Sequence, residues 1–190
     1  MELNELNALL DEGQTICEGS EEFALNAAIS LSTREALSKI NESTMSDEEA
    51  SEAFLGLIGA KAEGFRFFRP IYLDYGRNLH LGDNVFINAL TTIQDQGGVY
   101  IGNRVYIGHR VSIATLNHAF DPAHRADLRP KSVHIDDDVW IGDGAIILPG
   151  VHIGQGSIVG AGAVVSRDIP SGSIAVGVPA KVVGQIGDRE

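Results

Sequence analysis

Two histidines in an irregular stretch are the strongest candidates for chemistry in this chain. His118 and His124 lie in the polar segment 116–131, which contains two prolines and interrupts an otherwise regular repeat. An imidazole ordinarily titrates near pH ~6.5, so it can accept a proton from a hydroxyl near neutrality. His118 follows the last regular position before the interruption by five residues, so the repeat would fix its backbone and leave its side chain accessible. We therefore expect His118 to act as a general base.

Other chemical motifs are weak or missing. The single cysteine, Cys17, excludes an internal disulfide and a multi-cysteine metal site, and we expect its thiol to be at least half-buried. The chain has no GxSxG nucleophile motif, and the glycines between 142 and 162 follow the repeat rather than a phosphate-binding pattern. The remaining histidines fall within or beside the repeat, where we expect solvated imidazoles on the outside: His80, His109, His134 and His152.

The repeat that must position these residues has a period of six. Its aliphatic positions are Leu81, Ile87, Ile93, Ile101, Ile107, Ile113, Ile135, Ile141, Ile147, Ile153, Val159 and Val165. Glycine often follows directly, and the residue four places later is usually small or β-branched. This pattern is typical of a left-handed parallel β-helix, in which three hexapeptides form one triangular coil around an aliphatic core. A β-sandwich would instead show turns every 8–12 residues and period-two alternation.

Two interruptions break the period. The step from Ile93 to Ile101 is eight residues, and the step from Ile113 to Ile135 is 22 residues. An insertion in a solenoid must leave the coil as a loop, and loops on rigid scaffolds often carry function. We therefore predict one excursion loop at 116–132.

The first third of the chain has a different composition, poor in glycine and rich in helix formers. The segment 22–40 predicts an amphipathic helix, and the capping-box pattern from Ser46 to Glu49 predicts a second helix that runs through Ala62 and ends at Gly64. We predict a helical capping region at 1–63 and a β-helix domain at 64–190.

Charge and hydropathy exclude several classes of partner. The chain has 26 acidic and 14 basic residues, a net charge of −12, which disfavours binding to nucleic acid and to anionic membrane surfaces. No apolar run approaches the roughly 20 residues that span a bilayer, and the first residues lack a signal-peptide pattern. We expect a soluble, cytoplasmic protein.

Several motifs resemble one known family, the hexapeptide-repeat acyltransferases, and within it the maltose and galactoside O-acetyltransferases. The similar segments are YLDYGRNLHLG at 72–82, NHAFDP at 117–122, DVWIG at 138–142, ILPGVHIG at 147–154, GAGAVVSRDIP at 160–170 and GVPAK at 177–181, together with Asn88. The resemblance covers about residues 70–186 and extends weakly into the helical region.

The resemblance implies transfer of acetyl from acetyl-coenzyme A to a hydroxyl of a sugar-like acceptor, with no metal, in a homotrimer whose active sites lie between neighbouring coils. It implies that His118 is the base that deprotonates the acceptor as it attacks the thioester directly. The residues implied to line the acceptor pocket are Asp74, Asn88 and Asp95. The residues implied to bind coenzyme A are Trp140 through its ring, Asp143 and Ala161 through their backbone, and Ser166, Arg167 and Lys181.

This chain departs from the family pattern near the acceptor. Thr15 and Gln96 stand where the galactoside enzyme has acidic residues, and no glutamate occurs between His118 and Ile135. A carboxylate that elsewhere holds the histidine is therefore missing or replaced by Asp121 or Asp127. These departures leave the reaction as a prediction and put the identity of the acceptor in doubt.

Two alternatives stay open from the residues alone. One is a non-catalytic trimeric β-helix scaffold, since a short flat-faced solenoid exposes apolar faces that closed cyclic packing would bury. The other is a zinc lyase of the carbonic-anhydrase type, with a three-histidine site at a subunit interface to which His80, His118 and His124 could supply ligands. Bound zinc would favour the second, and failure to bind coenzyme A would favour the first.

Overall fold

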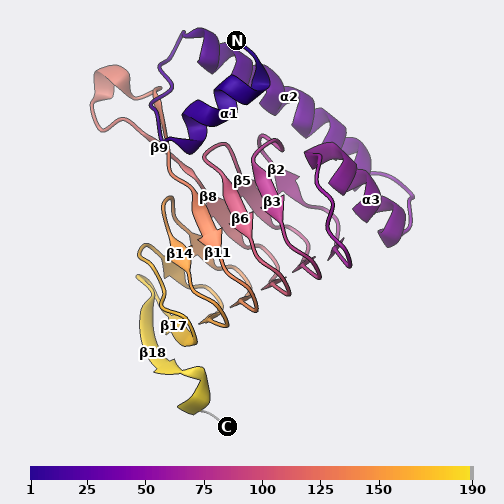
Figure 1. Ribbon diagram of the computed structural model, residues 1–190, viewed down its shortest axis with the longest axis vertical. Helices are drawn as coiled ribbons and strands as arrows, with labels where there is room; N and C mark the ends of the chain where they lie inside the picture. The colour runs from indigo at the N-terminus through magenta and orange to yellow at the C-terminus, as the bar shows by residue number, and fades with distance from the viewer. Residues whose placement is uncertain (189–190) are drawn as a thin grey trace.

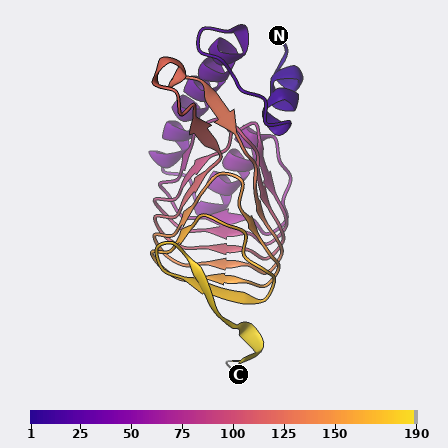
Figure 2. The same cartoon turned by 90° about the vertical axis from the view of Figure 1, so that its left-hand side faces the viewer.

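The computed structural model describes residues 1–188, in which a parallel β-solenoid of about six turns follows an N-terminal helical region (Figure 1). The predicted β-helix is therefore confirmed. Figure 2 shows the coils stacked on one another, with the helices at one end of the stack and the C-terminal strand at the other. No helix of the described chain is long and apolar enough to cross a membrane.

Three sheets form the faces of the solenoid. The longest contains β1 (Arg66–Phe67), β4 (Phe86–Ile87), β7 (Tyr106–Ile107), β12 (Trp140–Ile141), β15 (Ile158–Val159), β17 (Ser173–Val176) and β18 (Lys181–Gln185). The five-stranded sheet contains β2 (Tyr72–Leu73), β5 (Thr92–Gln94), β8 (Ser112–Ala114), β13 (Ile146–Ile147) and β16 (Val164–Val165). The four-stranded sheet contains β3 (Leu79–Leu81), β6 (Val99–Ile101), β11 (Val133–Ile135) and β14 (His152–Ile153).

The predicted repeat positions align in register from coil to coil. Ile107, for example, pairs with Ile87 on one side and Ile141 on the other, and its side chain is fully buried. Stacking of like aliphatic side chains fills the interior of the solenoid at close to crystal density, which is the main source of its stability. The small or β-branched residues four places after the repeat positions are also buried, as the pattern indicated, whereas Asn117, at the start of the excursion, is exposed.

Within the predicted β-helix domain, the repeat begins earlier than Leu81, the first position recognised in the sequence. Phe67 pairs with Ile87, and Leu73 pairs with Ile93, so a further turn precedes the recognised repeat. The sequence conceals this turn because an aromatic residue replaces an aliphatic one and because the step from Leu73 to Leu81 is eight residues long.

Glycine is required at a corner of the coil that bears on the functional site. A Cβ atom on Gly108 would lie 2.6 Å from the backbone nitrogen of Asp143 in the next coil. This distance is well inside van der Waals contact, so only glycine allows the two coils to approach here.

Three helices cover the first coil: α1 (Leu3–Asp11), α2 (Glu21–Asn41) and α3 (Asp47–Ile58). The predicted capping box is present, since the Ser46 hydroxyl accepts the Glu49 N–H and the Glu49 carboxylate accepts the Ser46 N–H. The predicted end at Ala62 is wrong. The helix stops at Ile58 because Gly59 adopts a left-handed conformation with φ 70°.

The helices are joined to the coil by packing and by specific hydrogen bonds. Phe54 of α3 stacks on Phe65 and lies 5.1 Å from the Phe67 ring, centroid to centroid. The Thr33 hydroxyl of α2 donates to the Tyr75 carbonyl at 2.6 Å. These contacts close the end of the core that would otherwise be open to water.

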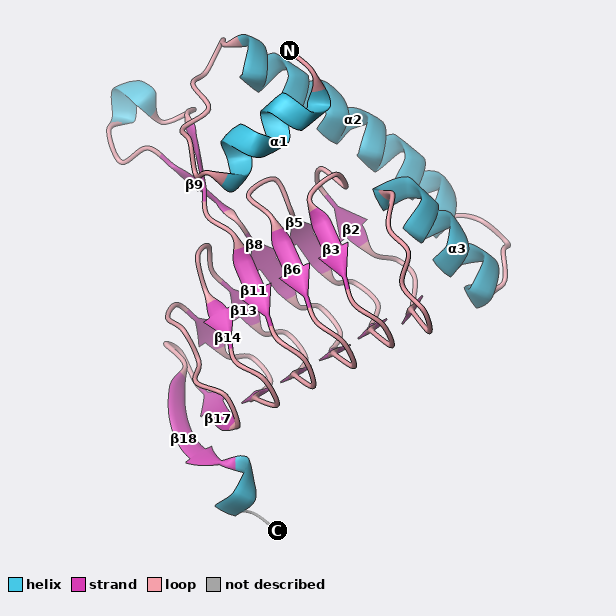
Figure 3. Cartoon of the chain, viewed as in Figure 1, coloured by secondary structure: helices cyan, strands magenta, loops and turns pink. Residues whose placement is uncertain are grey.

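The excursion from the coil is a hairpin with a short helical turn at its tip. Its elements are β9 (Leu116–His118), η1 (Pro122–His124) and β10 (Leu128–Pro130). The two strands form an antiparallel hairpin that projects from the coil (Figure 3). Leu128 lies opposite His118. The loop predicted at 116–132 is therefore largely regular in structure.

Candidate active site

His118 ends strand β9, and its side chain is exposed. Both backbone groups of Leu128 bond to Ile16, so Leu128 and His118 form a non-hydrogen-bonded pair of the hairpin. Side chains of such pairs lie on the same face at their closest approach, with Cα atoms about 4.5 Å apart. Leu128 therefore lies beside His118 on the same face of the hairpin, and the His118 side chain remains exposed.

Neither carboxylate suggested as a partner of His118 serves that purpose in this structure. Asp121 accepts from the Ala123 N–H and lies 2.8 Å from His124 Nδ1. Asp127 accepts the Glu18 N–H at 2.8 Å. The two acidic side chains of the hairpin are thus engaged elsewhere.

Asp74 lies on the same edge of the five-stranded sheet as His118. It follows β2 and is half-buried, beside a shallow depression of about 230 Å³ over β2, β5 and β8. Gln94 connects it to the hairpin, because the Gln94 amide lies 3.5 Å from Asp74 Oδ2 and its Oε1 accepts the Leu116 N–H at 3.2 Å. Sequence reasoning missed Gln94, since its partners are a remote side chain and a backbone group.

The prediction that Asp95 lines an acceptor pocket is wrong. Its side chain is 0% exposed, and its carboxylate accepts the N–H groups of Tyr75, Gly76 and Asn78. A carboxylate enclosed in this way holds the turn 75–78 and cannot reach a ligand.

The neighbouring Gln96 differs from Asp95 in having a side-chain oxygen without a partner. It is only 5% exposed, yet its Oε1 has no hydrogen-bond partner within the described part of the chain. A buried acceptor without a partner costs about 1–3 kcal/mol, so such an atom is commonly satisfied by water or another bound molecule.

Asn88 lies at a different corner of the coil. It follows β4, on the opposite edge of the five-stranded sheet from Asp74 and His118, and its amide donates to the Ile107 carbonyl at 3.1 Å. A single chain therefore does not bring Asn88 to His118.

Three of the six residues predicted to bind coenzyme A lie together on the Asn88 edge. Trp140, Asp143 and Ala161 line one groove of about 360 Å³, with glycines at 142 and 160 in its floor. The Trp140 ring is 54% exposed, which is unusual for tryptophan on a monomer surface. An exposed aromatic ring beside glycine backbone fits a slender, partly apolar chain that carries amide groups.

The other three predicted residues are divided between the two edges. Ser166 and Arg167 follow β16 on the edge of Asp74 and His118, and both are exposed. Lys181 begins β18, which pairs with β17 beyond the groove, and it too is exposed.

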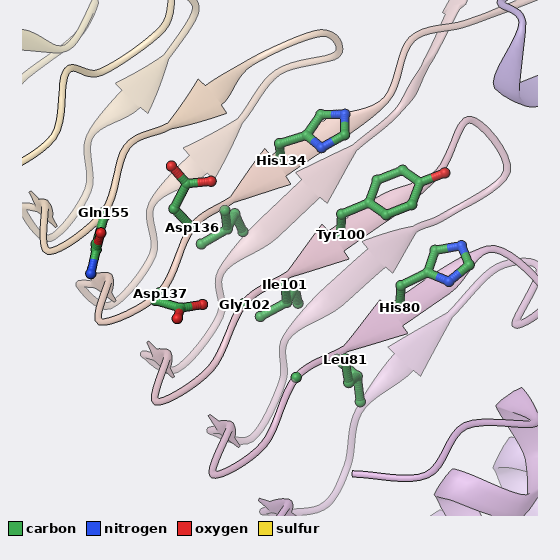
Figure 4. Close-up of a pocket in the computed structure, with 11 residues that line it drawn as sticks. His80, Leu81, Tyr100, Ile101, Gly102, His134, Asp136, Asp137 and Gln155 are labelled. Carbon is green, nitrogen blue, oxygen red and sulfur yellow. The ribbon is translucent and has the colours of Figure 1, made fainter.

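The histidines of the repeat lie on the outer face of the four-stranded sheet, apart from His109, and all four are exposed as expected. Three rings form a stack on this face (Figure 4), with centroids 4.5 Å apart for His80 and Tyr100 and 4.7 Å apart for Tyr100 and His134. Partial burial, followed by the nearby His152, lowers the pKa of His134. The Tyr100 ring is therefore stacked between the two imidazoles.

The postulated three-histidine zinc site does not assemble within one chain. His80 belongs to the ring stack, whereas His118 and His124 lie on the excursion hairpin. Across residues 1–188, no three histidine, cysteine or acidic side chains come together as metal ligands. Cys17 is exposed, contrary to the expectation of a half-buried thiol, because the segment after α1 runs along the surface of the hairpin.

Comparison with known proteins agrees with this geometry. Residues 132–167 match the family model for the bacterial transferase hexapeptide (six repeats). The galactoside O-acetyltransferase of Escherichia coli K12 is 34% identical over 182 residues, which cover 92% of this chain and 85% of that protein. The maltose O-acetyltransferase of Clostridium difficile 630 superposes with a TM-score of 0.86 at 30% identity, covering 94% of this chain and 96% of that one. A galactoside acetyltransferase in complex with coenzyme A gives a TM-score of 0.83 at 30% identity, over 100% and 93% of the two chains. The chain belongs to the hexapeptide-repeat acetyltransferases of the maltose and galactoside O-acetyltransferase family.

Proposed function

We propose that this protein transfers an acetyl group from acetyl-coenzyme A to a hydroxyl of a sugar, with His118 as the general base. The observation that carries the proposal is that this chain has both an accessible histidine on its excursion hairpin and, at the opposite edge of the five-stranded sheet, a groove lined by Trp140, Asp143 and Ala161. Relatives of similar length and fold are galactoside and maltose O-acetyltransferases. A cytoplasmic location, where acetyl-coenzyme A is made, is part of the same proposal.

His118 takes the proton from the acceptor hydroxyl while the oxygen forms a bond to the acetyl carbon. The carbon–sulfur bond then breaks, and the imidazolium returns the proton to the departing thiolate, so charge and atoms balance. The backbone N–H of Asp143 donates to the thioester oxygen as negative charge develops there. A positioned base contributes about 10²–10⁴ in rate, and holding the two substrates together contributes several kcal/mol more.

The acceptor would lie on the edge that carries His118, Asp74 and Gln96. The half-buried carboxylate of Asp74 can accept a hydrogen bond from one sugar hydroxyl, and the unpartnered Oε1 of Gln96 can accept a hydrogen bond from a second hydroxyl. Two hydrogen-bond acceptors beside a general base suit a polyhydroxylated molecule, because each of its hydroxyls is a hydrogen-bond donor.

The complete site requires a second copy of the chain. The groove of Trp140 and the side chain of Asn88 lie on one edge of the five-stranded sheet, whereas His118 and Arg167 lie on the other. A closed ring of three copies would place one edge against the opposite edge of its neighbour, which gives three equivalent sites. We therefore propose a homotrimer.

The test is release of the free thiol of coenzyme A from acetyl-coenzyme A, measured with a panel of sugars and small alcohols. We expect release that depends on a sugar and is lost in His118→Ala, whose affinity for coenzyme A is unchanged. Loss of coenzyme A affinity in His118→Ala would overturn the role given to the histidine. Failure of the wild-type protein to bind coenzyme A would favour the scaffold instead.

A further inference from the structure

The segment between α1 and α2 forms a third strand beside the hairpin that carries His118. The N–H of Ile16 donates to the Leu128 carbonyl, and the N–H of Leu128 donates to the Ile16 carbonyl, both at 2.9 Å. Figure 3 shows this segment of the helical region running past β9. The N-terminal region therefore contributes backbone hydrogen bonds directly to the excursion.

One side chain of the hairpin also binds this segment. Asp127 precedes Leu128, and its carboxylate accepts the Glu18 N–H at 2.8 Å. The two residues are 109 positions apart in the sequence. Together with the Ile16 bonds, this contact fixes the segment at two points two residues apart.

The same segment is anchored in a small apolar core. Ile16 is buried with Leu6, Leu10 and Tyr75, and Leu128 packs against this cluster from the hairpin. Packed side chains of this kind resist displacement, so the segment is a rigid support for the hairpin.

The support reaches His118 through its cross-strand neighbour. Leu128 lies opposite His118, and hydrogen bonds hold the outer side of Leu128 to Ile16. A shift of β10 would therefore shift β9 and the imidazole with it. Misplacement of a catalytic group by about 1 Å can reduce the rate by up to ~10²-fold.

We propose that Asp127 is a positioning residue for acetyl transfer, which holds the His118 hairpin in place by accepting the Glu18 N–H. This inference rests on the proposed function of His118. The carboxylate acts as a hydrogen-bond acceptor for the backbone, and its charge has no part in the reaction.

Three variants separate this role from others. Asp127→Ala removes the acceptor, whereas Asp127→Asn keeps an oxygen that can accept the same N–H. Glu18→Ala is the matched control, because Glu18 contributes its backbone N–H and the variant retains it. We expect kcat to fall about tenfold in Asp127→Ala and to stay within about twofold of wild type in the other two. The KM for acetyl-coenzyme A should not change in any of them, because neither Asp127 nor Glu18 lines the coenzyme A groove.

The pH–rate profile and amide exchange complete the test. A carboxylate acting directly on the imidazole would shift the acid limb of the profile in both Asp127 variants, whereas the proposed role leaves it in place. Equal loss of kcat in Asp127→Ala and Asp127→Asn, or no loss in Asp127→Ala, would overturn the proposal.

Hydrogen exchange of the amides at 116–118 and 128–129 gives a readout that does not depend on activity. The proposal predicts faster exchange in Asp127→Ala than in Asp127→Asn, and equal exchange would contradict it. If the wild-type protein transferred no acetyl group, the proposed function would fail, and this measurement would still decide whether Asp127 holds the hairpin.

Discussion

The buried carboxyl group of Asp95 makes folding stability depend on pH in a direction opposite to that of ordinary acid denaturation. Burial raises the pKa of Asp95 to about 6, and the N–H groups of Tyr75, Asn78 and Gly76 oppose this shift. The folded-state pKa lies above the ordinary value of 3.8, so the folded protein holds this proton more tightly than the unfolded chain does. The stabilising contribution is therefore complete below about pH 4 and is lost as the pH rises through about 6.

The size of the effect follows from the two pKa values. The gap between 3.8 and about 6 corresponds to about 3 kcal/mol in the free energy of unfolding, at about 1.4 kcal/mol for each pH unit. About 1 kcal/mol of this falls between pH 5 and pH 7. The substitution Asp95→Asn abolishes this titration. It also costs about 1–3 kcal/mol, because an amide offers one acceptor oxygen where the carboxylate offers two.

Urea unfolding at fixed protein concentration, followed by circular dichroism from pH 5 to pH 7, measures both the pH-dependent contribution of Asp95 and the constant cost of replacing it with asparagine. We expect Asp95→Asn to have a lower free energy of unfolding than wild type at every pH in this range. The difference between the two proteins should narrow by about 1 kcal/mol towards pH 7, because only the wild type loses stability as Asp95 ionises. Asp83→Asn is the control, because it removes an exposed carboxylate that accepts a backbone N–H from Glu63. A gap that widens with pH would refute the reasoning, since it would mean that the backbone N–H groups outweigh burial.

Three further substitutions test the core and the two halves of the site. Ile147→Ala removes a fully buried repeat residue and should lower the free energy of unfolding by about 2–5 kcal/mol in urea; a loss below ~1 kcal/mol would contradict the stacked core. Trp140→Ala should raise the calorimetric Kd for coenzyme A roughly tenfold. An unchanged Kd would mean that the Trp140 ring does not contribute to binding coenzyme A. Gln96→Leu should leave the melting temperature equal or higher, because it deletes a buried oxygen without a partner, while raising the KM for the sugar. A lower melting temperature with an unchanged KM would mean that Gln96 has only a structural role.

The solenoid could be predicted from the sequence because its signal is local and periodic. Each coil uses the same residue types at the same spacing, so the pairing of Ile107 with Ile141 follows from the period alone. The turn that contains Phe67 and Leu73 was missed because it departs from this period. The end of α3 was misplaced because Gly59 and Gly64 are equally good stop signals in sequence, and only packing distinguishes them.

The site was predictable in part. The grouping of Trp140, Asp143 and Ala161 follows from the coil register, since residues at equivalent corners stack. Asp95 was misassigned because adjacent residues at a corner point in different directions, and the sequence does not show which one faces the interior. The link from Asp127 to Glu18 could not be foreseen, because the donor is a backbone group and carries no residue-type signal.

The most direct test of the central claim is the rate of sugar acetylation by wild type and His118→Ala, followed by NMR of the acetylated product at saturating acetyl-coenzyme A. The account predicts an O-acetyl sugar as the product and a rate about 10²–10⁴-fold lower in the variant, with coenzyme A affinity unchanged. Equal rates for the two proteins would contradict it, because an enzyme that works without His118 must take the proton by another route.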